Sequence, residues 1–255
     1  MVYSDPVLQP FGNSTLVSMA HLLVSTRYGP AHFMLMDIMG SMVYGIRQRV
    51  EYDTNLEPFH HEPHPVEWAN CFPGGFQILL AMINNCRDQE VVVGYWQNIE
   101  QRLLSWSSRP KVELKGQESW KLIAWMAVQE SWRRTLLIYL YLAVCGVPTD
   151  DPRIQPSLRQ LFQLMGIIKR QDTPIANVIF LAQCFIAGIC SQTEKRKWLV
   201  RERLGHAAEN RFWMFRGLEI IPVLEHLWEG AASGGRAVTW DDYIHSRRTA
   251  LLLSG

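Results

Sequence analysis

At 255 residues, 48% of them hydrophobic, the chain is long enough for one large domain with a substantial core, which argues against disorder of the whole chain. Its 25 lysine and arginine residues are balanced by 24 aspartate and glutamate residues, so no overall field draws it to nucleic acid or to an anionic membrane. Any contact with DNA would need a local basic patch.

Cysteine usage and the start of the chain point to a soluble protein inside the cell. The first ten residues lack the basic start and the apolar stretch of a secretory signal. The most apolar run, Thr135 to Val147, has 13 residues, fewer than the ~20 that a membrane-spanning helix needs. An odd number of widely spread cysteines is typical of reduced core thiols. They are Cys71, Cys86, Cys145, Cys184 and Cys190.

Along the chain, the first clear patterns are a long connection and an amphipathic helix. Asn55 to Pro73, with four prolines and a histidine group, predicts an irregular loop of the kind that is often functional or mobile. Between residues 92 and 106, apolar residues recur at intervals of four and three, with polar residues on the other side. This pattern predicts a surface helix with one buried stripe, made of Val92, Trp96, Ile99, Leu103 and Trp106.

Gln117 to Cys145 is predicted to be the central helix. Apolar residues recur there at helical spacing, and Gly146 follows as a helix-ending glycine. In the C-terminal half the opposite face is apolar as well, which a helix tolerates only when it is packed on several sides. The residues of this second apolar face are Leu137, Ile138, Tyr141 and Leu142.

Three further helices follow the central one. Thr149 to Pro152 offers a carboxylate cap and a first-turn proline, so a helix is expected to begin near Pro152. Thr173-Pro174 opens an apolar helix through Ile189. Thr193 to Ala208 predicts a basic amphipathic helix.

The C-terminal part predicts two more helices. Phe212 to Trp228 predicts a helix bent at Pro222, and Gly230 to Gly235 predicts a loop. Thr239 can cap a short helix from Trp240 to about Arg248. Because strand patterns are weak throughout, we expect an all-α fold: a single large domain over residues 1–255, with roughly ten helices around the central apolar helix.

Three histidines within five positions raise the hypothesis of a metal site, since neutral imidazoles suit zinc, copper or nickel. Neighbouring prolines hold them in the predicted loop, and only Glu57 and Glu62 stand nearby as further ligands. A solvated loop is the better interpretation, so we predict no metal ligand, no cofactor and no stoichiometric zinc. The histidines are His60, His61 and His64, and the prolines are Pro58, Pro63 and Pro65.

Two acidic pairs, Asp150-Asp151 and Asp241-Asp242, raise the alternative of a helical magnesium-dependent enzyme that acts on a prenyl diphosphate. Such sites commonly carry a third acid one turn on, but Ile154 and His245 stand at those positions. Both pairs precede or begin predicted helices, where carboxylates cap the chain and face the positive end of the helix dipole. Capping is therefore the favoured interpretation.

The sequence has no Gly-x-Ser-x-Gly elbow and no phosphate-cradling glycine loop, so we assign no catalytic residue. Glu130 stands four residues before Arg134, a pairing that stabilises an exposed helix by roughly a few tenths of a kcal/mol, and we interpret it as structural. Ten tryptophans could line a ligand pocket, but most are expected in the core.

The predicted basic helix is the one candidate for contact with phosphates or with a nuclear-import receptor. Trp198, Leu199 and Val200 interrupt its charges, and Glu194 and Glu202 dilute them. A basic face of an amphipathic helix is usually just solvated. Its basic residues are Lys195, Arg196, Lys197, Arg201 and Arg203.

Several sequence motifs, which follow one another between about residues 40 and 248, resemble the regulatory domain of fungal zinc-cluster transcription factors. The resemblance is to the second of the two common types of this domain, in the form frequent in mushroom-forming fungi. The resemblance rests on separate blocks rather than on one short pattern. In chain order these are Tyr52-Asp53-Thr54-Asn55-Leu56-Glu57-Pro58, Glu67-Trp68 with Cys71-Phe72-Pro73, Glu130-Ser131-Trp132-Arg133 with Leu137-Ile138-Tyr139-Leu140-Tyr141, Asp151-Pro152-Arg153-Ile154-Gln155, Gly205-His206-Ala207-Ala208-Glu209-Asn210-Arg211, Pro222-Val223-Leu224-Glu225-His226-Leu227-Trp228 and Val238-Thr239-Trp240-Asp241-Asp242-Tyr243.

The resemblance implies an all-helical domain, nuclear location and a role in regulating transcription by RNA polymerase II. It offers no catalytic signature, so the shared motifs are interpreted as fold determinants, with five of their residues as polar struts. These are Arg133, Asp151, Arg153, Glu209 and Arg211. The family's zinc cluster uses six cysteines with Cys-x-x-Cys spacing, whereas Cys184 and Cys190, the nearest pair here, have five residues between them. We therefore expect no DNA-binding cluster in this chain.

Three functional hypotheses remain open from the sequence. The first is a regulatory module that binds protein partners or a small effector, with homo- or heterodimers possible, and that has no specific DNA affinity of its own and no membrane contact. The second is the magnesium-dependent enzyme built on the two acidic pairs. The third is a truncated relative that forms unproductive dimers with full-length factors. Metal-dependent turnover would identify the second, and co-purification with a longer homologue would identify the third.

Overall fold

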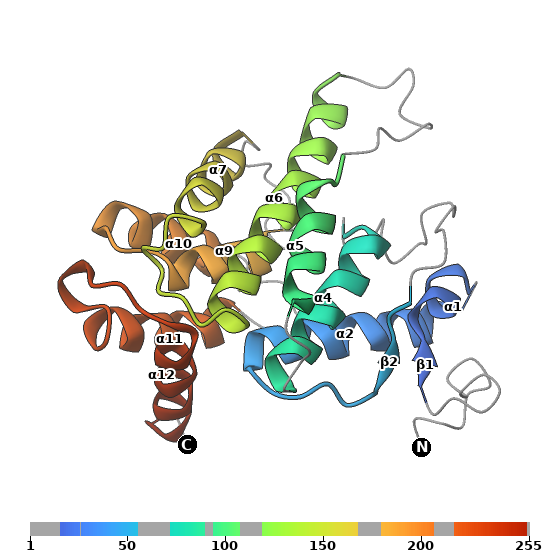
Figure 1. Ribbon diagram of the computed structural model, residues 1–255. Helices are drawn as coiled ribbons and strands as arrows, with labels where there is room; N and C mark the ends of the chain where they lie inside the picture. Colours follow the sequence, from blue (N-terminus) through green and yellow to red (C-terminus); the bar gives the residue numbers. More distant parts are fainter. Residues whose placement is uncertain are drawn as a thin grey trace. The chain divides into compact units, whose positions relative to one another are not determined.

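The computed structural model describes residues 16–25, 27–55, 72–89, 94–107, 119–167, 180–206 and 217–253. Ten α-helices lie in this part of the chain, with only one pair of two-residue strands, which confirms the all-α fold class (Figure 1). The chain forms two compact units, Met1–Ile99 and Glu100–Gly255. The prediction of one domain over residues 1–255 stays a prediction.

In the first unit, α1 (Met19–Val24) and α2 (Tyr28–Tyr44) pack together, and α2 packs on α4 (Gly74–Asp88). The strands β1 (Val17–Ser18) and β2 (Tyr52–Asp53) form a short parallel pair. Ser18 also begins α1, because its hydroxyl accepts a hydrogen bond from the backbone N–H of His21 at 3.3 Å. The strand pair therefore fixes where α1 starts.

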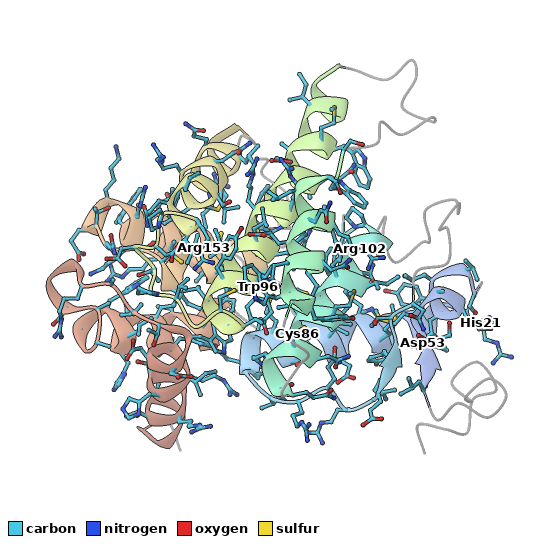
Figure 2. All side chains as sticks on the ribbon, in the orientation of Figure 1. His21, Asp53, Cys86, Trp96, Arg102 and Arg153 are labelled. Atoms are coloured by element: carbon cyan, nitrogen blue, oxygen red, sulfur yellow. The ribbon has the colours of Figure 1, made fainter. Side chains whose placement is uncertain are left out.

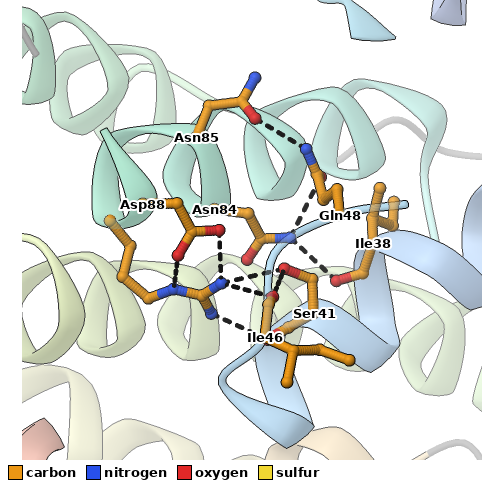
Figure 3. Close-up of polar contacts among 8 residues, drawn as sticks. Ile38, Ser41, Ile46, Gln48, Asn84, Asn85 and Asp88 are labelled. Atoms are coloured by element: carbon orange, nitrogen blue, oxygen red, sulfur yellow. Dashed lines mark hydrogen bonds and ion pairs between the residues drawn. The ribbon is translucent and has the colours of Figure 1, made fainter. Parts of the chain in front are cut away.

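A buried arginine joins α2 to α4. The Arg87 side chain is only 7% exposed, and it pairs with Asp88 at 2.8 Å. Its Nη1 donates to the backbone carbonyl of Ser41, and its Nη2 donates to the carbonyl of Ile46 at 2.7 Å (Figure 3). The Ser41 carbonyl belongs to the last turn of α2 and the Ile46 carbonyl follows the helix, so Arg87 acts as a C-terminal cap supplied by another helix.

The loop after α2 is held by one carboxylate. Asp37 accepts hydrogen bonds from the backbone N–H groups of Arg49 and Val50 and from the hydroxyl of Tyr52 at 3.0 Å. Tyr52 is the first residue of the first family-like block, and its hydrogen bond to Asp37 helps to fix the fold.

In the second unit, α6 (Ser119–Ala143) packs chiefly against α7 (Ile154–Ile167) and also against α9 (Leu181–Ile189) (Figure 1). Every residue from Thr135 to Leu142 is buried, so the prediction of a helix packed on several sides is confirmed. The helix ends at Ala143, two residues before the predicted end at Cys145, and the predicted helix-ending Gly146 follows with a φ of 64°, the left-handed conformation that glycine adopts without strain.

The other predicted helices are present with shifted boundaries: the apolar helix expected from Thr173-Pro174 is described only from Leu181, and its expected start lies outside the described residues. Of the predicted stripe, Ile99 and Leu103 are fully buried on α5 (Tyr95–Leu104) and Trp96 is half-buried there, whereas Trp106 follows the helix and Val92 lies outside the described residues. Next come α10 (Glu194–His206) and α11 (Gly217–Glu229), and the latter continues through Pro222. The loop from Gly230 contains the short 3-10 turn η5 (Ser233–Gly235). Helix α12 (Trp240–Leu253) was predicted too short, because a terminal run of Ala250 and leucines extends the helix beyond Arg248.

Three of the five cysteines are confirmed as buried free thiols: Cys86, Cys184 and Cys190. Burial raises the pKa of Cys86 to about 11 and the pKa of Cys184 and of Cys190 to about 12, so all three are protonated at neutral pH. Cys145 is a free thiol that is only partly buried, and Cys71 lies outside the described residues.

Candidate functional site

Helix α10 has a charged residue inside and a tryptophan outside. Lys197 is 5% exposed and lies on the same helix face as the buried Val200 and Leu204, whereas Trp198 is 60% exposed. The Nζ of Lys197 lies 2.8 Å from Oε1 of Glu194, which compensates its charge. The prediction of a solvated basic face is therefore wrong for Lys197.

Three other basic side chains of α10 are also engaged within the second unit. The Arg196 guanidinium lies 5.0 Å from the ring centre of Phe162, and Arg201 lies 4.8 Å from that of Trp228. Arg201 also pairs with Glu225 at 3.3 Å. Arg203 donates to the backbone carbonyl of Met165 in the last turn of α7. Packing against aromatic rings and helix ends, rather than solvation, is the main role of this basic segment.

The first acidic pair begins a helix. Oδ1 of Asp151 accepts the backbone N–H of Arg153 at 2.8 Å, and its backbone carbonyl accepts the N–H of Ile154, the first residue of α7. The Arg153 side chain, seen near the start of α7 in Figure 2, folds back onto the same carboxylate at 3.0 Å. This hydrogen bond with Arg153 lowers the pKa of Asp151. Capping is therefore confirmed as the role of Asp151.

The second acidic pair begins α12. Oδ2 of Asp242 accepts both the backbone N–H of Thr239 at 2.7 Å and its hydroxyl at 2.9 Å. In return, the Thr239 hydroxyl lies 3.4 Å from the N–H of Asp242, which completes a reciprocal capping box. Asp241 lies beside Asp242 in the positively polarised first turn. The capping function predicted for this pair is confirmed for Asp242.

The structure offers no metal centre in the ranges that it describes. Among those residues, no three histidine, cysteine, aspartate or glutamate side chains are grouped so that they could hold a metal ion. Asp151 and Asp242 are committed to the beginnings of their own helices. The histidine group His60, His61 and His64 lies outside the described residues.

A buried threonine links the two capped loops, a feature that the sequence pattern did not predict. Thr149 is 0% exposed, and its N–H donates to the backbone carbonyl of Val238 at 2.9 Å. The Val238 N–H donates back to Oγ1 of Thr149 at 3.1 Å, and Gln155 of α7 donates to the Thr149 carbonyl. The motif that starts at Asp151 and the motif that starts at Val238 are thus neighbours in space, although they are far apart in sequence.

Glu130 is the centre of a polar cluster between α6 and α7. Its carboxylate accepts hydrogen bonds from Arg133 at 2.7 Å, from Arg134 at 2.7 Å and from Gln160 at 3.3 Å. Arg133 also donates to the backbone carbonyl of Leu104 at the end of α5. The structural interpretation of Glu130 and Arg134 is confirmed, and Arg133 connects helices as the polar-strut hypothesis expects. Glu209 and Arg211 lie outside the described residues.

A second group of titratable side chains surrounds Tyr141. Its hydroxyl donates to Oε1 of Glu100 at 2.6 Å, and the Arg153 guanidinium lies 5.1 Å from the ring centre. Burial first, and then the Glu100 carboxylate, raise the pKa of Tyr141, so the phenol stays protonated. Burial also raises the pKa of the nearby Cys145 thiol. These groups connect α5, α6 and the start of α7, and the Tyr141 hydroxyl and the Cys145 thiol stay protonated.

Of the seven tryptophans whose side chains the structure describes, three lie in the core and three are half-buried, so the prediction that most are core residues holds only in part. Trp132, Trp228 and Trp240 are each at most 5% exposed, and the indole N–H of Trp228 donates to the backbone carbonyl of Gly188 at 2.9 Å. Trp198 is the exposed one among them, a large apolar side chain on the surface of α10. The helical pattern alone could not show that Trp198 is exposed. An apolar residue is expected to face the core, but here the neighbouring Lys197 takes that position.

Helix caps, interhelical struts and packed cations thus define a helical scaffold domain. The chain matches the family model of the fungal specific transcription factor domain over residues 31–254. It belongs to this family, which confirms the resemblance seen in the sequence and extends it beyond residues 40 and 248. No curated protein and no solved structure matches the chain. In the described residues, no helix is both long and apolar enough to cross a bilayer.

Proposed function

We propose that this chain is the regulatory and interaction domain of a fungal zinc-cluster transcription factor. In this proposal it acts in the nucleus and controls transcription by RNA polymerase II by binding a protein partner or a small effector. The observation that carries the proposal is the family match over residues 31–254. The polar groups of the family-like motifs support it as well, because they cap and connect helices in a scaffold.

The proposal assigns sequence-specific DNA recognition to a segment other than this domain. The chain is nearly neutral, and four of the five basic side chains of α10 contact groups of their own fold. Fluorescence anisotropy with the purified chain at physiological salt should therefore show at most weak duplex binding, around 10⁻⁴ M or poorer, with little preference between sequences. Tight, sequence-selective binding would contradict this division of roles.

A fusion experiment tests the regulatory role. With the chain fused behind a heterologous DNA-binding domain, transcription of a reporter that carries the matching sites should change relative to the DNA-binding domain alone. Leu136→Asp provides the control, because it places a carboxylate at a fully buried position of α6 and should unfold the domain. A wild-type fusion that is expressed and bound to its sites but leaves transcription unchanged would contradict the proposal.

A further inference from the structure

The guanidinium group of Arg134 on α6 has an unused end. Its Nε donates to Oε1 of Glu130 at 2.7 Å, and within the described ranges its terminal nitrogens Nη1 and Nη2 have no hydrogen-bond partner. The side chain is 18% exposed, and neither nitrogen is a buried unsatisfied group, so the unused end faces the surface. Two N–H groups side by side at the end of a guanidinium match the two oxygens of a carboxylate.

The charge around this end is positive by one elementary charge. Glu130 also accepts two hydrogen bonds from Arg133, at 2.7 and 2.8 Å, so one carboxylate is shared between two guanidinium groups. Glu130 is the only acidic residue of α6, and α7 and α9, which pack on α6, have none. Glu100 of α5 is bonded to the Tyr141 hydroxyl, about two turns further along α6. A ligand with one negative charge would therefore balance the cluster.

Exposed apolar side chains continue the same face of α6. Met126, Glu130 and Arg134 follow one another at intervals of four residues, and Ile123 stands three residues before Met126, so the four lie along one ridge of the helix. Helical side chains lean towards the N-terminal end, which directs the unused end of Arg134 towards Met126. Met126 is 39% exposed and Ile123 is 55% exposed. A ligand held by Arg134 would thus lie with its other end against apolar side chains.

A small monocarboxylate with an apolar tail fits this ridge better than a phosphate, a nucleic acid or a protein. A phosphate group carries up to about two charges and would lie beside the Glu130 carboxylate, where only one positive charge is in excess. Nucleic acid binding needs several phosphate contacts. A stable protein interface buries about 800 Å² on each partner, more than two partly exposed side chains provide.

We propose that the α6 ridge formed by Ile123, Met126 and Arg134 binds a small monocarboxylate with an apolar tail, with the carboxylate on the two Nη groups of Arg134 and the tail along Met126 and Ile123. This inference rests on the proposed function, because it names the chemical class of the small effector that the regulatory domain binds. The charge and the tail make separate contributions, so a ligand that lacks either one binds more weakly.

Isothermal titration calorimetry of the full chain with decanoate tests the proposal. Decanoate should bind saturably at one site per chain, whereas acetate, which lacks the tail, and decan-1-ol, which lacks the charge, should bind at least about tenfold more weakly. Arg134→Gln should weaken decanoate binding by about tenfold or more, and Met126→Ala by several-fold. In Arg134→Gln, Glu130 keeps both hydrogen bonds from Arg133, so the fold is expected to persist.

Two variants elsewhere on the surface provide matched controls. Arg248→Gln removes the same charge from an exposed position of α12, and Trp198→Ala removes an apolar side chain that is more exposed than Met126 or Ile123. Both should bind decanoate as the wild type does. Thermal melts show whether each variant is folded, and the comparison of the three ligands needs only the wild type, so it tests the proposal even where a variant does not fold.

The ridge proposal is overturned if decanoate does not bind, if decan-1-ol binds as tightly, or if the two controls lose as much affinity as Arg134→Gln. It is also overturned if inorganic phosphate binds more tightly than decanoate, or if sedimentation shows a dimer that Met126→Ala abolishes. The reporter fusion separates the two levels. If decanoate never binds while the wild-type fusion changes transcription, the effector site fails and the proposed function stands.

Discussion

At the level of single residues, Lys197 shows how a charged side chain can occupy a position that faces the core. Its ammonium group is paired with Glu194, and it lies 5.9 Å from the ring centre of Trp228, which adds an aromatic contact. Removing a lysine from water is costly unless the charge is compensated, and the gain of a buried pair over an apolar residue is often small. The role of Lys197 is therefore to occupy space and to fix the orientation of α10.

Lys197→Met tests this role. Methionine fills a similar volume without a charge to compensate, so the free energy of unfolding should change by no more than about 1 kcal/mol in either direction. Lys197→Glu, which places a carboxylate beside Glu194, should destabilise the chain by several kcal/mol, roughly the scale of an uncompensated buried charge. Denaturant unfolding measures both variants, and a large loss in Lys197→Met would mean that the charge itself stabilises the fold.

The two members of the first acidic pair are predicted to differ. Asp151→Ala removes the side-chain cap of α7 and should lower the free energy of unfolding by about 1 to 2 kcal/mol, whereas the exposed Asp150→Ala should leave it nearly unchanged. Because Arg153 lowers the pKa of Asp151 in the folded chain, the stabilisation is present above the usual carboxyl pKa of about 3.9 and is lost as the pH falls through the lowered value.

Thermal melts between neutral and acidic pH check both statements. The difference between wild type and Asp151→Ala should shrink on acidification, because both chains then lack a charged cap. If instead Asp150→Ala is the more damaging change, the cap has been assigned to the wrong carboxylate.

At the level of helices, the second unit depends on one close approach among α9, α10 and α11. A Cβ atom added to Gly188 of α9 would lie 2.6 Å from Cδ1 of Leu224 and 3.2 Å from Cγ1 of Val200. The Gly188 carbonyl also accepts the indole N–H of Trp228. The absence of a side chain at Gly188 thus lets α11 and α10 pack closely on α9, where Trp228 contacts Lys197 and Arg201 of α10.

Gly188→Ala should destabilise the chain by about 1 to 3 kcal/mol, the usual cost of overpacking a core. Gly166→Ala is the matched control: this helical glycine is exposed and has no atom within 4 Å of the added Cβ, so alanine should be neutral or stabilise α7 by up to about 1 kcal/mol. Calorimetric unfolding of the two variants provides the comparison. Equal stabilities would contradict a close helix contact at Gly188.

At the level of the whole second unit, Thr149 and Val238 join two segments that are far apart in the sequence. Their reciprocal hydrogen bonds join the loop between α6 and α7 to the loop before α12. Aromatic contacts hold α12 nearby: Trp240 lies 5.1 Å from the ring of Tyr139 on α6, and Tyr243 lies 5.1 Å from Phe185 on α9. The family-like block that starts at Val238 therefore fixes the last helix onto the centre of this unit.

Thr149→Val tests the joint between these loops. Valine keeps the shape but leaves the buried N–H of Val238 without its acceptor, which should cost about 1 to 3 kcal/mol. Thr149→Ser keeps the hydroxyl and should lose less. Amide hydrogen exchange should show faster opening of the Val238 N–H and of the first turn of α12 in Thr149→Val. Unchanged protection there would mean that the aromatic contacts alone hold α12.

The sequence by itself determined the elements whose causes are local. The periodicity of residues 119–143, the glycine at position 146 and the caps at Asp151 and Thr239 each act within a few residues, so the all-α fold and the helices from α5 to α12 could be predicted. No pattern predicted α1, α2 or α4 individually. The block-wise resemblance gave the family in the same way. The tertiary structure alone decided which side chains meet: the Arg87 cap, the Thr149 joint, the burial of Lys197 and the exposure of Trp198. These depend on partners that are distant in sequence, and helical periodicity cannot tell which of two adjacent residues faces a neighbour when a charge can be paired inside.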